Sequence, residues 1–139
     1  YMVLPEKMAR LFSSMAQDYS QTCSKLEQLT LAMFMESGHY QTHIKKLRKL
    51  YSQKLSAVTD TFAEAASDFV TVKNTSSGIS VILNVKSSKM TEELKKDAEQ
   101  LGIPAVPHPK EGLLALYYNQ IPLVEIPQLF RTLIERWRA

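Results

Sequence analysis

The feature that most constrains the fold is a stripe of apolar residues in the middle of the chain. Apolar side chains recur there at gaps of three and four, at Ile44, Leu47, Tyr51, Leu55, Val58, Phe62 and Ala65. This spacing places them along one face of an α-helix of about six turns. We expect the stripe to be buried along its whole length, and the helix to connect a large structural unit with a small one.

Two shorter helices are expected before this long one. Pro5 followed by Glu6 is typical of a helix start, and apolar residues then recur at helical spacing at Met8, Leu11, Phe12 and Met15. A second helix carries Leu26, Leu29 and Met33, and Ser37-Gly38 predicts its end. These helices are expected to pack through their apolar faces.

The apolar run Tyr1–Leu4 is typical of a short β-strand. Because the chain starts inside this run, and with a tyrosine, we expect it to be a fragment of a longer protein.

After Phe69 the apolar period changes from helical to two. Phe69–Lys73 alternates, Asn74–Gly78 is rich in turn residues, and Ile79, Val81, Leu83 and Val85 then share one face. This pattern predicts an antiparallel hairpin.

The rest of the chain completes an α+β fold. A helix is expected from Thr91 to Gly102, strands at Ile103–Val106 and Leu113–Tyr118, and a final helix that begins near Pro127. The long connecting helices are thus followed by the order β-β-α-β-β-α, which predicts an antiparallel sheet with helices on one face.

Composition indicates an ordinary globular protein, with 45% hydrophobic and 22% charged residues. The sequence has no apolar run of transmembrane length and no signal-peptide pattern, so we expect no membrane partner and a cytoplasmic location. The single cysteine, Cys23, cannot form an internal disulfide, which suits a reducing compartment.

Basic residues cluster near the start of the long helix, at Lys45, Lys46, Arg48, Lys49 and Lys54. Such a cluster is either a nucleic-acid footprint or the solvated face of an amphipathic helix. We favour the solvated face, because no aromatic residue or glycine is interleaved with these basic residues for contacts with bases.

Candidate catalytic and metal-binding residues are few. His39 and His43 share a helical face, but the residues between them complete no metal-binding motif. Cys23 precedes a helix, where a thiol can be reactive, but no histidine lies near it in the sequence. We therefore predict no metal site and no catalytic residue, so that this chain alone is not an enzyme.

Residues 21–54 closely resemble the MocR/GabR regulators, a branch of the GntR class. The resemblance extends without gaps over Ser24, Leu26, Gln28, Phe34, Met35, Gly38, Tyr40, His43, Ile44, Lys45, Arg48 and Tyr51. Tyr1–Pro5 is similar to the strand that follows the cofactor lysine in that family.

The resemblance implies a winged helix-turn-helix joined to a fold-type-I aminotransferase-like domain, which binds pyridoxal phosphate and senses a small amino compound. This chain would be the C-terminal part of that domain. Residues 1–36 would end the large lobe, residues 37–66 would form the connecting helix, and residues 67–139 would form the small lobe. The implied partners are a second copy in a homodimer and the effector, with DNA bound only by the winged helix-turn-helix outside this chain.

Two departures from the family bear on ligand binding. The cofactor lysine would lie just upstream of Tyr1, so we expect no cofactor-binding residue here and no covalently held pyridoxal phosphate. The alignment also places Gln120, flanked by Asn119 and Tyr118, where the family has an arginine for the effector carboxylate. These three residues are predicted to lie near the effector. Because glutamine supplies no charged bidentate clamp, either the effector is not a simple amino acid or its carboxylate is held elsewhere.

Two other functions remain open. The chain could be the C-terminal fragment of a genuine aminotransferase, because the fold is shared and fold does not fix function. It could also be a free-standing α+β regulatory module. The missing arginine at Gln120 favours the regulator.

Overall fold

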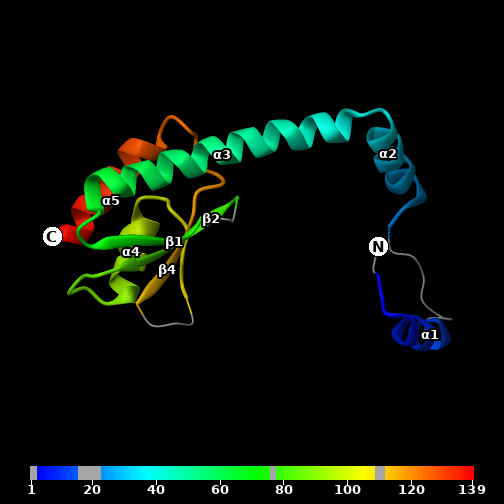
Figure 1. Ribbon diagram of the computed structural model, residues 1–139, viewed down its shortest axis with the longest axis horizontal. Coiled ribbons are helices and arrows are strands. Elements are labelled where there is room, and N and C mark those ends of the chain that lie inside the picture. The colour runs from blue at the N-terminus through cyan, green and yellow to red at the C-terminus, as the bar shows by residue number, and fades with distance from the viewer. Residues whose placement is uncertain (1–2, 16–22, 76–77, 109–111) are drawn as a thin grey trace. The chain divides into compact units, whose positions relative to one another are not determined.

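The computed structural model describes residues 3–15, 23–75, 78–108 and 112–139. The chain divides into two compact units, Tyr1–Thr42 and His43–Ala139. Figure 1 shows the ribbon of both units with most helices and strands labelled.

The first unit contains the helices α1 (Glu6–Met15) and α2 (Lys25–Glu36) and the start of α3 (His39–Ala66). A capping box begins α2: the Ser24 hydroxyl accepts the Glu27 backbone N–H at 3.2 Å, and the Glu27 carboxylate accepts the Ser24 N–H at 3.2 Å. Gly38, at a φ of 76°, separates α2 from α3. The three predicted helices of this region are confirmed.

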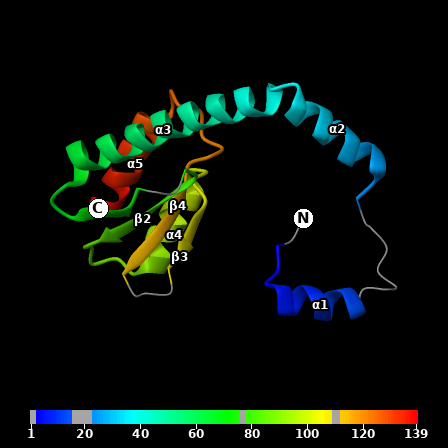
Figure 2. The same ribbon diagram turned by 45° about the vertical axis from the view of Figure 1, so that its right-hand side comes forward.

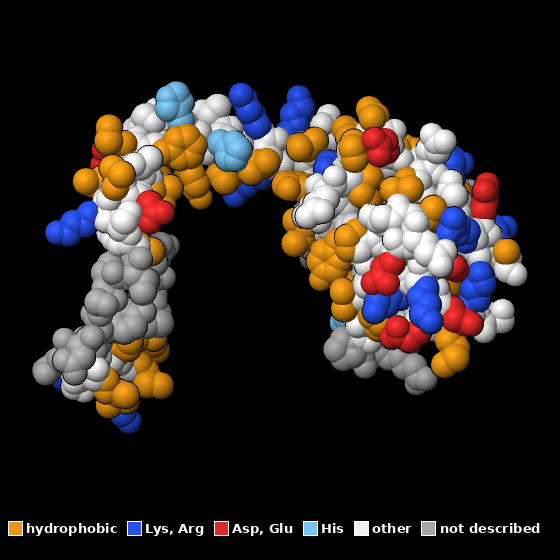
Figure 3. Space-filling model, turned by 180° about the vertical axis from the view of Figure 1, so that it is seen from behind, with side chains coloured by type: hydrophobic (Ala, Val, Ile, Leu, Met, Phe, Trp, Pro, Cys, Tyr) orange, Lys and Arg blue, Asp and Glu red, His pale blue; other side chains and the backbone are white. Residues whose placement is uncertain are grey.

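The first unit buries no side chain of either α1 or α2. Figure 3 shows hydrophobic side chains at the surface of both helices. The largest of them are Met8, Leu11, Phe12, Met15, Leu26, Leu29, Leu31, Met33, Phe34 and Met35. The apolar faces are therefore present as predicted, but they form no core among the described residues.

The strand expected at Tyr1–Leu4 is not found at Val3 and Leu4, which belong to no helix or strand. No described strand of this unit could pair with them, and an isolated extended segment has no partner for its backbone groups. Tyr1 and Met2 lie outside the described residues.

The second unit is built on a four-stranded antiparallel sheet. Its strands are β1 (Val70–Asn74), β2 (Ser80–Val85), β3 (Ala105–Pro107) and β4 (Leu113–Tyr117), in the order β1-β2-β4-β3. The helices α4 (Thr91–Gln100) and α5 (Ile126–Arg138) follow β2 and β4. Figure 2 shows α3 and α5 beside the sheet. The predicted order β-β-α-β-β-α is confirmed.

The core lies between one face of the sheet and the three helices. Alternate residues of β2 and β4 are buried and join the buried side chains of α3, α4 and α5 in one cluster. Phe62 of α3 contacts the rings of Phe130 and Trp137 of α5, with centroids 5.6 and 6.3 Å apart. The Trp137 Nε1–H donates to the Leu94 carbonyl of α4 at 3.2 Å. The helices therefore cover one face of the sheet, as the sequence predicted.

Two burial predictions are wrong. Within the second unit, α3 buries its apolar stripe only from Val58 onward, because the core cluster reaches α3 from Leu55 to Ala66 and not before. Ile79, expected on the buried face of β2, precedes the first residue of that strand and is 46% exposed. The N-terminal part of the stripe is thus left as a half-exposed apolar surface on this unit.

Candidate functional site

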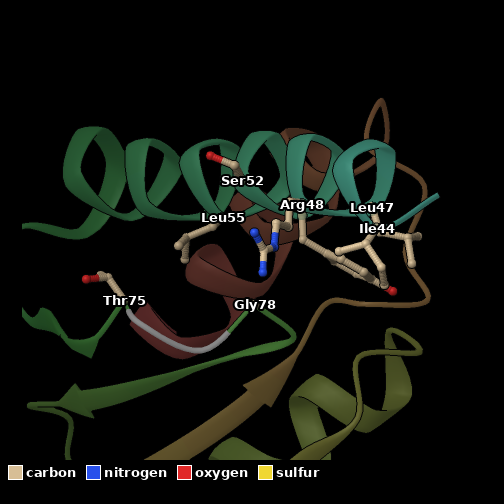
Figure 4. A pocket seen from close by; sticks show the side chains of 8 residues that line it. Ile44, Leu47, Arg48, Ser52, Leu55, Thr75 and Gly78 are labelled. Atoms are coloured by element: carbon tan, nitrogen blue, oxygen red, sulfur yellow. The ribbon is translucent and has the colours of Figure 1, made fainter. Parts of the chain in front are cut away.

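A hollow of about 410 Å³ lies in the second unit between α3 and the β1–β2 hairpin. It is lined by Ile44, Leu47, Arg48, Tyr51, Ser52, Leu55, Thr75 and Gly78 (Figure 4). Its volume is in the range of small-molecule sites, which are mostly apolar with a few polar groups.

One wall of the hollow is the part of the apolar stripe before Val58, which the core does not fully bury. Ile44, Leu47, Tyr51 and Leu55 follow one another at gaps of three and four, so α3 presents all four on one face. Each is half-buried. The apolar stripe thus packs into the core in the C-terminal half of α3 and lines the hollow in the preceding part of the helix.

The hairpin supplies the facing wall through Thr75 and Gly78, while residues 76–77 lie outside the described residues. A Cβ atom placed on Gly78 would lie 3.9 Å from the Tyr51 Cβ. A side chain at position 78 would therefore occupy the space between the two walls, which glycine leaves open.

Arg48 is the charged residue among the described residues that line the hollow. Figure 4 shows its guanidinium directed across the hollow toward Gly78. Within the described part of the chain, no hydrogen bond or ion pair joins this guanidinium to another residue. Such an arginine can bind an anionic group of a ligand, while the adjacent apolar wall can contact an apolar part of the same ligand.

The predicted effector-proximal residues lie at the same end of the second unit. The Tyr118 N–H donates to the Ile79 carbonyl at 3.1 Å, which ties the end of β4 to the residue after Gly78. Tyr118 is fully buried, and burial raises the pKa of its hydroxyl. Asn119 is half-buried and Gln120 is exposed. None of these three residues lines the hollow, although hydrogen bonds connect Tyr118 to Ile79 and Asn119 to Lys54.

Lys54 provides a second connection, which the sequence analysis missed. It is only 6% exposed, its Nζ donates to the Asn119 carbonyl at 2.8 Å, and it lies 5.8 Å from the centroid of the Tyr51 ring. The prediction of a solvated basic face is therefore right for Lys45, Lys46, Arg48 and Lys49 and wrong for Lys54. The sequence did contain a signal for this burial: Lys54 follows Tyr51 by three positions, and residues three apart share a helical face.

The other candidates are not brought together. His39 stacks on Phe34 with ring centroids 6.3 Å apart, while His43 and Cys23 are exposed. The described residues contain no group of three histidine, cysteine, aspartate or glutamate side chains that could hold a metal ion. None of the described helices is both long and apolar enough to span a membrane.

Comparison with known proteins supports the predicted class. No protein-family model matches the chain. It is 28% identical to an uncharacterized HTH-type transcriptional regulator, YdeL of Bacillus subtilis, over 99% of this chain and 31% of that protein. It is 22% identical to the probable rhizopine catabolism regulatory protein MocR of Rhizobium meliloti, over 74% of this chain and 21% of that protein.

Solved structures with the same fold are aminotransferases. LysN, the α-aminoadipate aminotransferase of Thermus thermophilus, matches 99% of this chain and 36% of its own chain, at a TM-score of 0.76 and 18% identity. The kynurenine aminotransferase of Pyrococcus horikoshii matches 96% of this chain and 35% of its own, at a TM-score of 0.75 and 16% identity. These likenesses show the fold.

The fold is therefore that of the C-terminal portion of a fold-type-I aminotransferase, as predicted. The resemblance to MocR-type regulators is also confirmed, because the similar sequences are HTH-type transcriptional regulators that include MocR. The chain spans less than a third of the length of these regulators.

Proposed function

We propose that this chain is the C-terminal part of the effector-binding and dimerisation domain of a PLP-binding, GntR/MocR-type transcriptional regulator that senses a small amino compound. One observation carries the proposal. The same residues that have an aminotransferase fold align over 99% of the chain with an HTH-type regulator. An aminotransferase fold in a DNA-binding protein is suited to sensing rather than turnover.

The proposal divides the chain into residues 1–36 from the large lobe, residues 37–66 as connecting helix, and residues 67–139 as the small lobe. The second unit supports a separate small lobe, because the sheet, α4 and α5 form one core together with the C-terminal half of α3. The first unit supports it differently: α1 and α2 bury nothing by themselves, as expected of a segment that belongs to a larger lobe.

Pyridoxal phosphate belongs to the parent protein in this proposal, and it supplies an aldehyde that reacts with amines. The described residues here do not fit a covalent cofactor site. The buried lysine among them, Lys54, donates to a backbone carbonyl, and no lysine lies in the family's cofactor motif. The cofactor lysine is proposed to lie upstream of Tyr1.

Tyr118, Asn119 and Gln120 are proposed to lie near the effector in the parent. Their support is the backbone bond from Tyr118 to Ile79 and the bond from Lys54 to Asn119, which fix this segment beside the hollow. The parent is further proposed to act in the cytoplasm as a homodimer and to bind DNA through a winged helix-turn-helix outside this chain.

The alternative is a genuine fold-type-I aminotransferase, and the solved aminotransferases of the same fold favour it. The two functions differ in what an amino compound does. In a regulator it changes the affinity for DNA, whereas in an aminotransferase it is converted to a keto acid.

The test is to measure both properties of the full-length parent loaded with pyridoxal phosphate. The regulator predicts operator binding in a gel-shift assay, a change in that affinity with an amino compound, and no sustained keto-acid production. Sustained transamination without operator binding would establish the enzyme instead.

A further inference from the structure

The hollow between α3 and the hairpin combines an apolar wall with a cation, Arg48, that has no partner among the residues that the structure describes. Ile44, Leu47, Tyr51 and Leu55 form the apolar wall, and Arg48 projects its guanidinium into the same space (Figure 4). A purely apolar ligand would leave this cation without an anion, and a small inorganic anion would leave the apolar wall exposed to water. A ligand that satisfies both has an apolar body and an anionic group.

We propose that this hollow binds a small carboxylate with an apolar body and that Arg48 holds the carboxylate. The inference rests on the proposed function in one respect: it identifies this ligand class with the effector. Gln120 stands where a clamp arginine was expected, so the anionic group of an effector needs another cation, and Arg48 lies at the same end of the unit.

The surroundings of Arg48 favour this role over a structural one. Among the described residues, no hydrogen bond or ion pair of Arg48 gives it a structural role. Lys54, six residues further along α3, by contrast donates a hydrogen bond to the Asn119 carbonyl. Of these two cations near Tyr51, Arg48 is the one that remains able to meet a ligand.

Gly78 has a matching role in the hollow. Its Cα faces the Tyr51 Cβ closely enough that an added Cβ would lie 3.9 Å away. Glycine therefore keeps the space open at the point toward which Arg48 is directed, and the apolar body of the ligand would lie between the two walls.

The test uses hydrocinnamate, which has an apolar phenylethyl group and a carboxylate, and its uncharged amide, hydrocinnamide. Both are titrated into the isotope-labelled chain at neutral pH, and binding is followed by heteronuclear NMR. We expect shifts at Leu47, Arg48 and Gly78, with hydrocinnamate binding about fivefold tighter than the amide, as an exposed ion pair provides.

Two variants of equal charge separate a specific contact from general attraction. Arg48→Gln should remove the preference for the carboxylate while the amide still binds. Lys45→Gln changes an exposed lysine that does not line the hollow and should leave the preference intact. The spectra of the free variants check that both remain folded.

The proposal is overturned if the carboxylate and the amide bind equally, if neither shifts the lining residues, or if both variants lose the same amount of affinity. Each of these results concerns the 139-residue chain without cofactor or DNA. They would leave the proposed regulator function standing, because that function is tested separately by operator binding of the parent.

Discussion

Lys54 and Asn119 are 65 positions apart, and the Lys54 ammonium donates a 2.8 Å hydrogen bond to the Asn119 carbonyl. This contact joins the middle of α3 to the turn after β4. It fixes the segment that contains Gln120 relative to the helix that lines the hollow. Lys54 is only 6% exposed, and a buried charged group destabilises the fold unless it is hydrogen-bonded. The Asn119 carbonyl therefore offsets the cost of burying the Lys54 ammonium.

Replacing Lys54 should therefore destabilise the second unit. Lys54→Met keeps an unbranched side chain that is one atom shorter, but it leaves the Asn119 carbonyl without this donor. We expect a loss of about 1–3 kcal/mol in the free energy of unfolding, measured by urea denaturation. Lys49→Met, at an exposed position of the same helix, is the control and should change stability by less than about 0.5 kcal/mol. Equal effects of the two variants would contradict the role assigned to Lys54.

Trp137 should be a major contributor to the stability of the second unit. Its ring stacks on Phe62 and its Nε1–H bonds the Leu94 carbonyl, so it joins α3, α4 and α5. Trp137→Ala should cost about 3–5 kcal/mol in thermal or urea unfolding. Trp137→Phe, which keeps a ring but lacks the N–H donor, should cost clearly less. A small effect of the alanine variant would show that the core does not depend on this helix.

Filling the hollow should abolish ligand binding without unfolding the chain. Gly78→Phe places a ring between the two walls, and a Cβ atom at this position would lie 3.9 Å from the Tyr51 Cβ, which is an ordinary van der Waals distance. We expect an unchanged unfolding midpoint and loss of the hydrocinnamate-induced NMR shifts. Gly78→Ala adds only one methyl group and should keep part of the binding. Full binding by the phenylalanine variant would place the ligand elsewhere.

The chain should self-associate through the apolar faces of its first two helices. These helices bury no side chain, and they expose ten large apolar residues to solvent. Sedimentation equilibrium should show a mass that rises with concentration. Leu29→Glu, which puts a charge on the exposed face of α2, should shift the equilibrium toward monomer. A monomer at all concentrations would contradict this prediction and weaken the proposed homodimer.

The isolated chain should hold no pyridoxal phosphate at a specific site. It has no lysine in a cofactor motif, and Lys54 is engaged with a carbonyl. Titration with the cofactor should give only a slow, unsaturable absorbance change from exposed lysines. A saturable change at one equivalent would show that a specific lysine in this chain binds the cofactor, contrary to the proposal.

Local patterns predicted most of the fold. Period-two alternation at Val81, Leu83 and Val85 identified β2, and helical gaps identified α3, because burial on one face imposes these periods directly. The order of strands in the sheet could not be predicted from local patterns, because it depends on pairing between segments far apart in the sequence. The extent of burial along α3 also depends on tertiary packing, which is why Tyr51 was expected in a core and lies in a hollow.

The site could be predicted only in part. The resemblance drew attention to Tyr118, Asn119 and Gln120. None of the three lines the hollow, and hydrogen bonds connect Tyr118 to Ile79 and Asn119 to Lys54. The roles of Lys54 and Arg48 could not be separated by sequence, because both belong to one run of basic residues on one helix. Only the tertiary structure shows that the first bonds a distant carbonyl and the second faces an apolar wall.

The proposal that this chain belongs to a regulator with an aminotransferase-like sensor domain is best tested by sequencing the reading frame that encodes the residues before Tyr1. We expect a winged helix-turn-helix followed by a domain that ends in a Ser-x-x-Lys motif just before Tyr1. A lysine motif without the DNA-binding segment, or a start codon beside Tyr1, would contradict it.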